Sequence, residues 1–351
     1  MNPRIQTANY TRITRAYLAE VVEPAIQRLS VTHTPANHAY MVADLAIAIT
    51  SFSPLMSEHF VRALAHLPKP ATSDPDLIVY IWDSAGTGVK MAPPWSVPAH
   101  HSLETNAHRV SEDSFIGIYM HFDDTITLYD PVNKRAYFWM YDATHIPVWI
   151  RAAPFRTLFQ WALGERDIHL VHGAVVSESD KAILLTAKGG SGKSTTALAC
   201  LKVGMQYLAD DYVAVSRGSE PHAYSLYNSV KVAPYQGNDF DPMHVTETEG
   251  EKSVVYLSSI FPQQMAYSSP LKAVMIPQIM NAEKTAILPA TKAQAMLALI
   301  PTTLFQLPLA ESNKVQLLSS IIAALPCYTV ALGRDSIEAA QTIRGFIREN
   351  L

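Results

Sequence analysis

The chain has 351 residues, of which 48% are hydrophobic and 17% charged, and its formal net charge is −4. This composition favours one or two folded domains with buried cores and excludes global disorder. The small negative charge provides no general attraction to nucleic acid or to anionic lipid, so we expect neither as a partner.

The two cysteines, Cys200 and Cys327, lie in apolar stretches far apart and without the spacing of a metal site. They indicate buried, reduced thiols, which suit the cytosol. Residues 1–15 lack the apolar segment of a signal peptide, and no apolar stretch reaches the roughly 18 residues that a membrane span needs. We therefore expect a cytoplasmic protein without a membrane segment.

The first part of the chain, residues 1–147, predicts an α+β domain with an antiparallel sheet, and we expect this domain to take part in substrate recognition. A helix kinked at Pro24 is expected at Ala16–Leu29. Another helix is expected at Met56–Leu67, and the Pro-rich stretch Met91–His101 predicts a loop. Strands are expected at Leu45–Thr50, Leu77–Trp82, Phe115–Met120, Thr125–Leu128 and Ala136–Met140.

Residues 148–351 show a different pattern, in which strands and helices alternate around a glycine-rich turn and the C-terminal end is helical. This order predicts an α/β fold with helices packed on a sheet. Strands are expected at Ile168–Val176, Ala182–Ala187, Gln206–Val215, Leu226–Val232, Leu271–Ile279 and Tyr328–Ala331, and helices at Phe155–Leu163, Ser194–Val203, Ala293–Ala298, Ser312–Ala324 and Ser336–Glu349.

The strongest motif is the run AILLTAKGGSGKSTTALAC, which begins at Ala182. A phosphate group must be met by several donors at once, and a loop of small residues before a helix provides backbone N–H groups and the positive end of the helix. Lys193 is placed to reach the β- and γ-phosphates, and the Ser194 hydroxyl is placed to bind Mg²⁺. Ala187 stands where the usual pattern has its first glycine. The expected nucleotide-binding residues are Gly189, Gly190, Ser191, Gly192, Lys193, Ser194 and Thr195.

Two adjacent carboxylates, Asp210 and Asp211, follow an apolar stretch after the loop helix. Neighbouring negative charges raise the pKa of one carboxyl, so the natural division gives one to a metal ion and the other to an incoming hydroxyl as proton acceptor. The alternative is a polar strand end or a helix cap. His172 lies in the strand just before the strand that leads into the glycine-rich loop. A histidine in such a strand is more often a core side chain whose hydrogen bonds are satisfied.

Together these segments resemble the catalytic domain of HPr kinase/phosphorylase, whose wider fold is shared with ATP-dependent phosphoenolpyruvate carboxykinase. The resemblance rests on Val171-His172-Gly173, the loop Leu184–Thr195 and the segment Gly204–Asp211. The layout is also similar to the HPr-kinase-like serine kinases of lasso-peptide and other modified-peptide pathways. The cues for that narrower likeness are Ile81–Asp83, Pro93–Trp95 and Ala152–Arg156.

The resemblance implies ATP and Mg²⁺ as cofactors, Lys193 on the phosphates, and Ser194 and Asp211 at the metal. It implies Asp210 as the base that takes the hydroxyl proton, with His172 near the transferring phosphoryl group. It also leaves homo-oligomerisation open, because HPr kinases are hexamers. Arg156 is a candidate to offset phosphoryl charge, although arginines on helix surfaces are common.

The chain departs from the family at two places. The family's metal-binding glutamate, some twenty residues beyond the aspartates, has no counterpart within Tyr227–Lys231, and the Gln-x-Gly-Arg-Asn segment is missing. Lys231 and Lys252 could supply substitute positive charge in place of this glutamate, although surface lysines are the commoner case. Trp82 and Trp95 either line a substrate groove or are buried. HPr itself is therefore not the expected acceptor.

Three functions follow from these observations. The first is an ATP- and Mg²⁺-dependent kinase acting on a serine-type hydroxyl of a peptide or small protein. The second is a kinase of a small-molecule hydroxyl, and the third is a nucleotide-binding regulatory protein without catalysis.

Overall fold

The computed structural model describes residues 15–91, 107–112, 115–120, 123–232, 240, 245–246, 252–307 and 314–351. Residues 92–101 of the loop predicted at Met91–His101 lie outside these ranges, and they include Trp95 and its neighbours. The chain divides into two compact units, and the second begins at Val148 and also includes residues 41–44 and 62–68. No helix in the described ranges has both the length and the apolar character that crossing a membrane requires.

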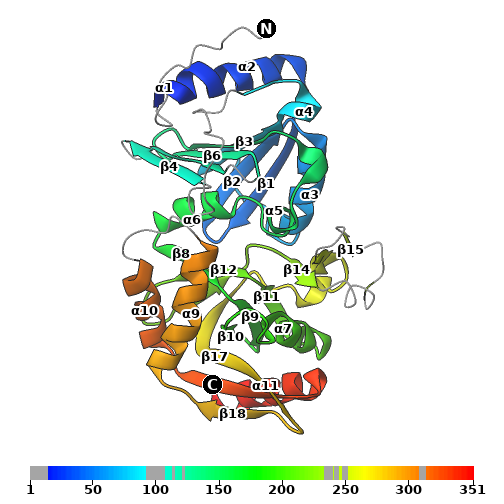
Figure 1. The fold of residues 1–351 in the computed structure, drawn as a ribbon, viewed down its shortest axis with the longest axis vertical. Coiled ribbons are helices and arrows are strands. Elements are labelled where there is room, and N and C mark those ends of the chain that lie inside the picture. The colour runs from blue at the N-terminus through cyan, green and yellow to red at the C-terminus, as the bar shows by residue number, and fades with distance from the viewer. Residues whose placement is uncertain are drawn as a thin grey trace, which may run out of the picture. The chain divides into compact units, whose positions relative to one another are not determined.

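The first unit is built on a mixed sheet of seven strands within the described residues, in the order β1-β2-β3-β7-β6-β5-β4 (Figure 1). Its strands are β1 (Ala36–Val42), β2 (Leu45–Ser51), β3 (Leu77–Asp83), β4 (Ala107–Glu112), β5 (Phe115–Met120), β6 (Thr125–Asp130) and β7 (Arg135–Met140), and its helices are α1 (Arg15–Tyr17), α2 (Glu23–Thr32), α3 (Pro54–Leu64) and α4 (Ser84–Thr87).

The prediction of an antiparallel sheet is wrong for two of the strand pairs in this unit. Strands β2 and β3, and likewise β3 and β7, pair in parallel, whereas β7, β6, β5 and β4 pair antiparallel. The parallel pair β2–β3 is possible because α3 crosses over between the two strands, as a parallel connection requires. The expected kink at Pro24 takes the form of a π-helical turn, Leu18–Val22, directly before α2.

The second unit contains a larger mixed sheet with helices on both faces. Its described strands follow the order β11-β9-β10-β17-β13-β12-β8, and β19 pairs with β17 and β18. They are β8 (Ile168–His172), β9 (Ala174–Glu178), β10 (Lys181–Leu185), β11 (Gln206–Ala209), β12 (Tyr212–Ser216), β13 (His222–Tyr224), β17 (Ser268–Ala282), β18 (Ala286–Pro289) and β19 (Cys327–Gly333). A small separate sheet joins β14 (Ser229–Val232), β16 (Ser253–Tyr256) and β15 (Val245–Thr246).

The helices of this unit are α5 (Val148–Ala152), α6 (Arg156–Gly164), α7 (Lys193–Lys202), α9 (Lys292–Gln306), α10 (Lys314–Ala324) and α11 (Ser336–Asn350). The predicted helix at Ala293–Ala298 is much longer, because Pro301 is accommodated inside α9. There the Thr302 hydroxyl donates to the carbonyls of Ala298 and Leu299, whereas the N–H that Pro301 lacks would have bonded the Leu297 carbonyl.

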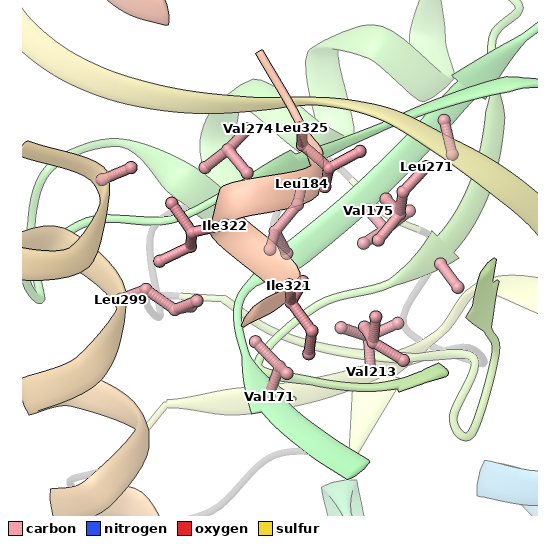
Figure 2. Packing of buried hydrophobic residues seen from close by; sticks show 14 of the residues in the cluster. Val171, Val175, Leu184, Val213, Leu271, Val274, Leu299, Ile321, Ile322 and Leu325 are labelled. Atoms are coloured by element: carbon pink, nitrogen blue, oxygen red, sulfur yellow. The ribbon is translucent and has the colours of Figure 1, made fainter. Parts of the chain in front are cut away.

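Alternating side chains of the strands point to two separate cores. Figure 2 shows one of them, in which Val175 and Leu184 of the sheet meet Leu299 of α9 and Ile321 of α10. The neighbouring positions in the same strands face the other way and pack against α7 and α11. The strands are therefore apolar on both faces, as expected for a sheet covered by helices on both sides.

Two long predicted strands are each interrupted, at Gly173 and at Asp210-Asp211. β8 and β12 pair with each other, while β9 pairs with β11, so the two interruptions face one another. The Gly173 N–H donates to the Asp211 carbonyl over 3.1 Å. A Cβ at position 173 would lie 2.9 Å from the Leu185 carbonyl oxygen, so only glycine fits this close approach.

Candidate active site

The glycine-rich loop connects the end of β10 to the start of α7. Gly190 and Gly192 have φ angles of 77° and 95°, in the left-handed region that favours glycine. A Cβ at Gly192 would also lie only 3.0 Å from the Leu332 methyl carbon Cδ1. The Ser191 hydroxyl donates to the Lys188 carbonyl over 2.7 Å, which holds the turn closed on itself.

Lys193 is the first residue of α7, and its side chain turns back into the loop. Its ammonium donates to the carbonyls of Ala187 at 2.8 Å and Lys188 at 3.1 Å. Burial lowers the pKa of Lys193, although the charges of Asp210 and Asp211 act in the opposite direction. The ammonium is thus held inside the curve of the loop, where a phosphate would meet both it and the loop amides.

Asp210 follows β11 and is 4% exposed. Neither of its carboxylate oxygens has a hydrogen bond of good geometry within the described part of the chain. Burial and the negative charge of Asp211 raise the pKa of Asp210 to about 7, against the opposing effects of the Ser194 hydroxyl and Lys231. A buried carboxylate without partners is costly, and it marks a position where a ligand or a proton is expected.

Asp211 is fixed by its surroundings in a different way. Its φ of 64° turns its carboxylate out of the strand direction, toward Lys231 Nζ at 2.8 Å and His172 Nε2 at 3.6 Å. Burial would raise the pKa of Asp211, but the hydrogen bonds and positive charge supplied by His172 and Lys231 outweigh it and lower the pKa. Asp211 is therefore an ionised carboxylate that already has a cation beside it.

His172 ends β8, and the fold brings it to the loop because Ala174, two residues later, pairs with Leu185 at the end of β10. Its backbone N–H donates to the Thr303 hydroxyl of α9 over 3.1 Å. Its ring Nδ1 is buried without a partner among the described residues. The interpretation of His172 as a satisfied core residue is therefore wrong, since one ring nitrogen contacts Asp211 and the other is unpaired.

A cleft of about 620 Å³ brings these groups together. On one side it is lined by the loop and the start of α7, and on the other by the last turns of α9. Of the predicted site residues, Asp210, Ser191, Gly192 and Thr195 are not in this lining. The lining residues are His172, Lys188, Gly189, Gly190, Lys193, Ser194, Asp211, Lys231, Lys252, Pro301, Thr302, Phe305 and Gln306.

Arg156 does not line the cleft. Its guanidinium donates to the Tyr212 hydroxyl over 2.6 Å and lies 4.9 Å above the centre of the same ring. The Tyr212 hydroxyl in turn donates to the Gln306 side-chain oxygen over 3.1 Å. Arg156 is thus connected to the cleft only by hydrogen bonds, through Tyr212 to Gln306, which lines the cleft.

Of the two alternatives for Trp82, burial is confirmed, because the side chain lies fully buried in the core of the first unit. Lys231 is not a surface lysine, because its side chain is 23% exposed and paired with Asp211, whereas Lys252 is exposed. The signal that could have found Lys231 was its position, about where the HPr kinase pattern has its glutamate. No sequence signal marked Thr303, Tyr212 or Gln306.

The residues present fit a nucleoside triphosphate and a divalent cation. The loop offers N–H groups and Lys193 for phosphates, and the Ser194 hydroxyl and the unpaired Asp210 oxygens are hard donors of the kind that Mg²⁺ prefers. Within the described ranges, no three or more His, Cys, Asp or Glu side chains lie together as a ready-made metal site. A cation here would accordingly depend on phosphate oxygens for several of its ligands.

No family model matches the chain, and no curated protein matches it. Among solved structures, the Hpr(Ser) kinase/phosphatase from Coxiella burnetii is similar with a TM-score of 0.28 and 9% identity, over 51% of this chain and 94% of that chain. At this TM-score the likeness carries no inference about function. The chain has a mixed α/β fold in which a glycine-rich loop, Lys193 and Asp211 line one cleft, with Asp210 buried next to Asp211.

Proposed function

We propose that this protein is an ATP- and Mg²⁺-dependent kinase that transfers the γ-phosphoryl group to a serine-type hydroxyl. The observation that carries the proposal is that Lys193, Ser194 and Asp211 line one cleft at the glycine-rich loop, with the buried Asp210 beside Ser194 and Asp211. A turn that only connected a strand to a helix would have no reason to bury a carboxylate whose oxygens lack hydrogen bonds of good geometry.

The side chains divide the work as follows. Lys193 and the loop amides would bind the β- and γ-phosphates, and Ser194 with Asp211 would hold Mg²⁺, which would neutralise phosphate charge when bound. Asp210 accepts the hydroxyl proton, since its oxygens are unpaired and its pKa is about 7. The hydroxyl oxygen bonds to the γ-phosphorus as the bond to the bridging oxygen of ADP breaks.

A serine of a peptide or small protein is the acceptor that we favour. Phe305 is 83% exposed although it lines the cleft, and Pro301 lies on the same wall. An apolar wall beside the phosphate loop suits the side chains that flank a serine in a peptide. A small-molecule hydroxyl would use the same chemistry, and a regulatory protein would bind nucleotide without transfer.

The test is incubation with ATP, Mg²⁺ and a panel of serine peptides and hydroxyl metabolites, followed by mass spectrometry for a phosphoryl mass shift. We expect Lys193→Met to abolish ATP binding and turnover, and Asp210→Asn to abolish transfer while nucleotide still binds. If Asp210→Asn kept full transfer activity and Asp211→Asn lost it, the proton acceptor would be Asp211, which lines the cleft. Nucleotide binding without any phosphorylated product would favour the regulatory function.

A further inference from the structure

Lys231 extends from β14 into the cleft and makes the shortest described contact of Asp211, at 2.8 Å. Both side chains are only about a quarter exposed, 23% for Lys231 and 24% for Asp211. The partners come from separate parts of the chain, since the strand that bears Lys231 belongs to the small sheet of β14, β15 and β16. An ion pair so shielded from water is stronger than a surface pair.

The geometry of Asp211 leaves little freedom for another arrangement. Its backbone is anchored by the Gly173 N–H, and its two carboxylate oxygens are directed at different partners, Oδ1 at His172 and Oδ2 at Lys231. The carboxylate therefore has a cation on one oxygen and an imidazole on the other before any ligand binds. A divalent ion at this carboxylate would have to displace the ammonium or share its place.

The positive charge beside Asp211 is supplied by a lysine of the chain itself. Lys193 and Lys231 lie near the two carboxylates, and Lys188 and Lys252 also line the cleft. Lys193 belongs to the phosphate loop. Lys231, on β14, lies beside the acidic pair and offsets its negative charge. An ammonium carries one charge and three donors, and, unlike a hydrated divalent ion, it needs no oxygen ligands.

We infer that Lys231 is a resident cation that takes the place of a metal ion at Asp211, so that the chain binds a single divalent cation with its nucleotide. That cation would be held by Ser194 and the phosphates, while Asp210 remains the proton acceptor and Asp211 and His172 stay with Lys231. Asp211 is then not a metal ligand. Only the statement about the nucleotide-bound protein rests on the proposed function.

The test counts Mn²⁺ ions by electron paramagnetic resonance titration, with and without the non-hydrolysable analogue AMP-PNP. Wild type should bind one Mn²⁺ per AMP-PNP complex and none at Asp211 without nucleotide. Lys231→Glu should gain one site in both conditions, formed with Asp211 and His172. Lys231→Met, which is milder for folding, should gain the same site with an affinity about tenfold weaker. Lys284→Met and Lys284→Glu, at an exposed lysine in the turn after β17, are the matched controls.

Two Mn²⁺ ions per wild-type AMP-PNP complex would overturn the inference, and so would folded Lys231→Glu and Lys231→Met proteins that gain no site. Failure of the proposed kinase function is a separate result. It would appear as wild type that binds no AMP-PNP or transfers no phosphoryl group, while the nucleotide-free titration of the Lys231 variants would still decide the role of this lysine.

Discussion

Replacing Asp210 by asparagine is expected to stabilise the nucleotide-free protein above neutral pH. The carboxylate is buried, no hydrogen bond of good geometry reaches its oxygens, and burial together with Asp211 raises its pKa from an ordinary 3.8 to about 7. The folded state therefore holds this proton more tightly than the unfolded chain. The stability that this proton contributes is fully present below the pKa of the unfolded chain and is lost as the pH rises through about 7. At alkaline pH the buried charge therefore destabilises the folded state, on the order of a few kcal/mol.

The assay is thermal unfolding with a metal chelator and without nucleotide, at about pH 8 and about pH 4. Asp210→Asn should melt several degrees above wild type at the higher pH, and the two should converge at the lower pH. Glu283→Gln, an exposed carboxylate in the turn after β17, controls for removal of one charge. If Asp210→Asn destabilised the protein equally at both pH values, the carboxylate would have stabilising partners and the reasoning would be refuted.

Three other substitutions probe the loop and the core. Gly192→Ala forces a Cβ against Leu332 at a φ of 95°, so it should weaken binding of a fluorescent ATP analogue by about tenfold or more; unchanged affinity would mean that the loop adapts. Burial lowers the pKa of His66 to about 3. The neutral ring therefore stabilises the folded state at pH values above the pKa that the ring has in the unfolded chain. The midpoint of urea unfolding should fall as the pH drops from about 6.5 toward 3. His66→Gln should flatten this dependence, and an unchanged slope would assign it to other groups. Leu184→Ala leaves a cavity beneath α9 and α10 and should cost about 2–5 kcal/mol in urea unfolding, whereas a cost below about 1 kcal/mol would indicate a loose core.

Local patterns in the sequence predicted most of the helices and strands of the second unit. Apolar runs such as Lys181–Leu185 and Cys327–Gly333 are strands, because a sheet covered on both faces needs side chains that are apolar on both sides. Because the runs around Gly173 and Asp211 are apolar almost throughout, the interruptions of the strands there could not be predicted. An apolar run carries no sign of a change of pairing partner, and the turn at Asp211 depends on a hydrogen bond from a residue 38 positions earlier.

The glycine loop, Lys193 and the two aspartates could be named from the sequence because each belongs to a short motif with its own chemistry. Lys231, Thr303 and Gln306 belong to no such motif, and only the tertiary fold brings them to the cleft. Lysine is usually a surface residue, so its burial against Asp211 depends on where β14 lies. The parallel strands of the first unit escaped prediction for a similar reason, since pairing direction is decided by distant crossovers.

The most direct test of the central claim is a crystal structure with AMP-PNP and Mg²⁺. We predict the γ-phosphate in contact with the Lys193 ammonium and the loop amides, one metal ion bound to the Ser194 hydroxyl, and the acidic pair facing the γ-phosphorus. A nucleotide bound away from the glycine-rich loop, or carboxylates of residues 210 and 211 directed away from the γ-phosphate with no metal between them, would contradict the assignment of this cleft to phosphoryl transfer.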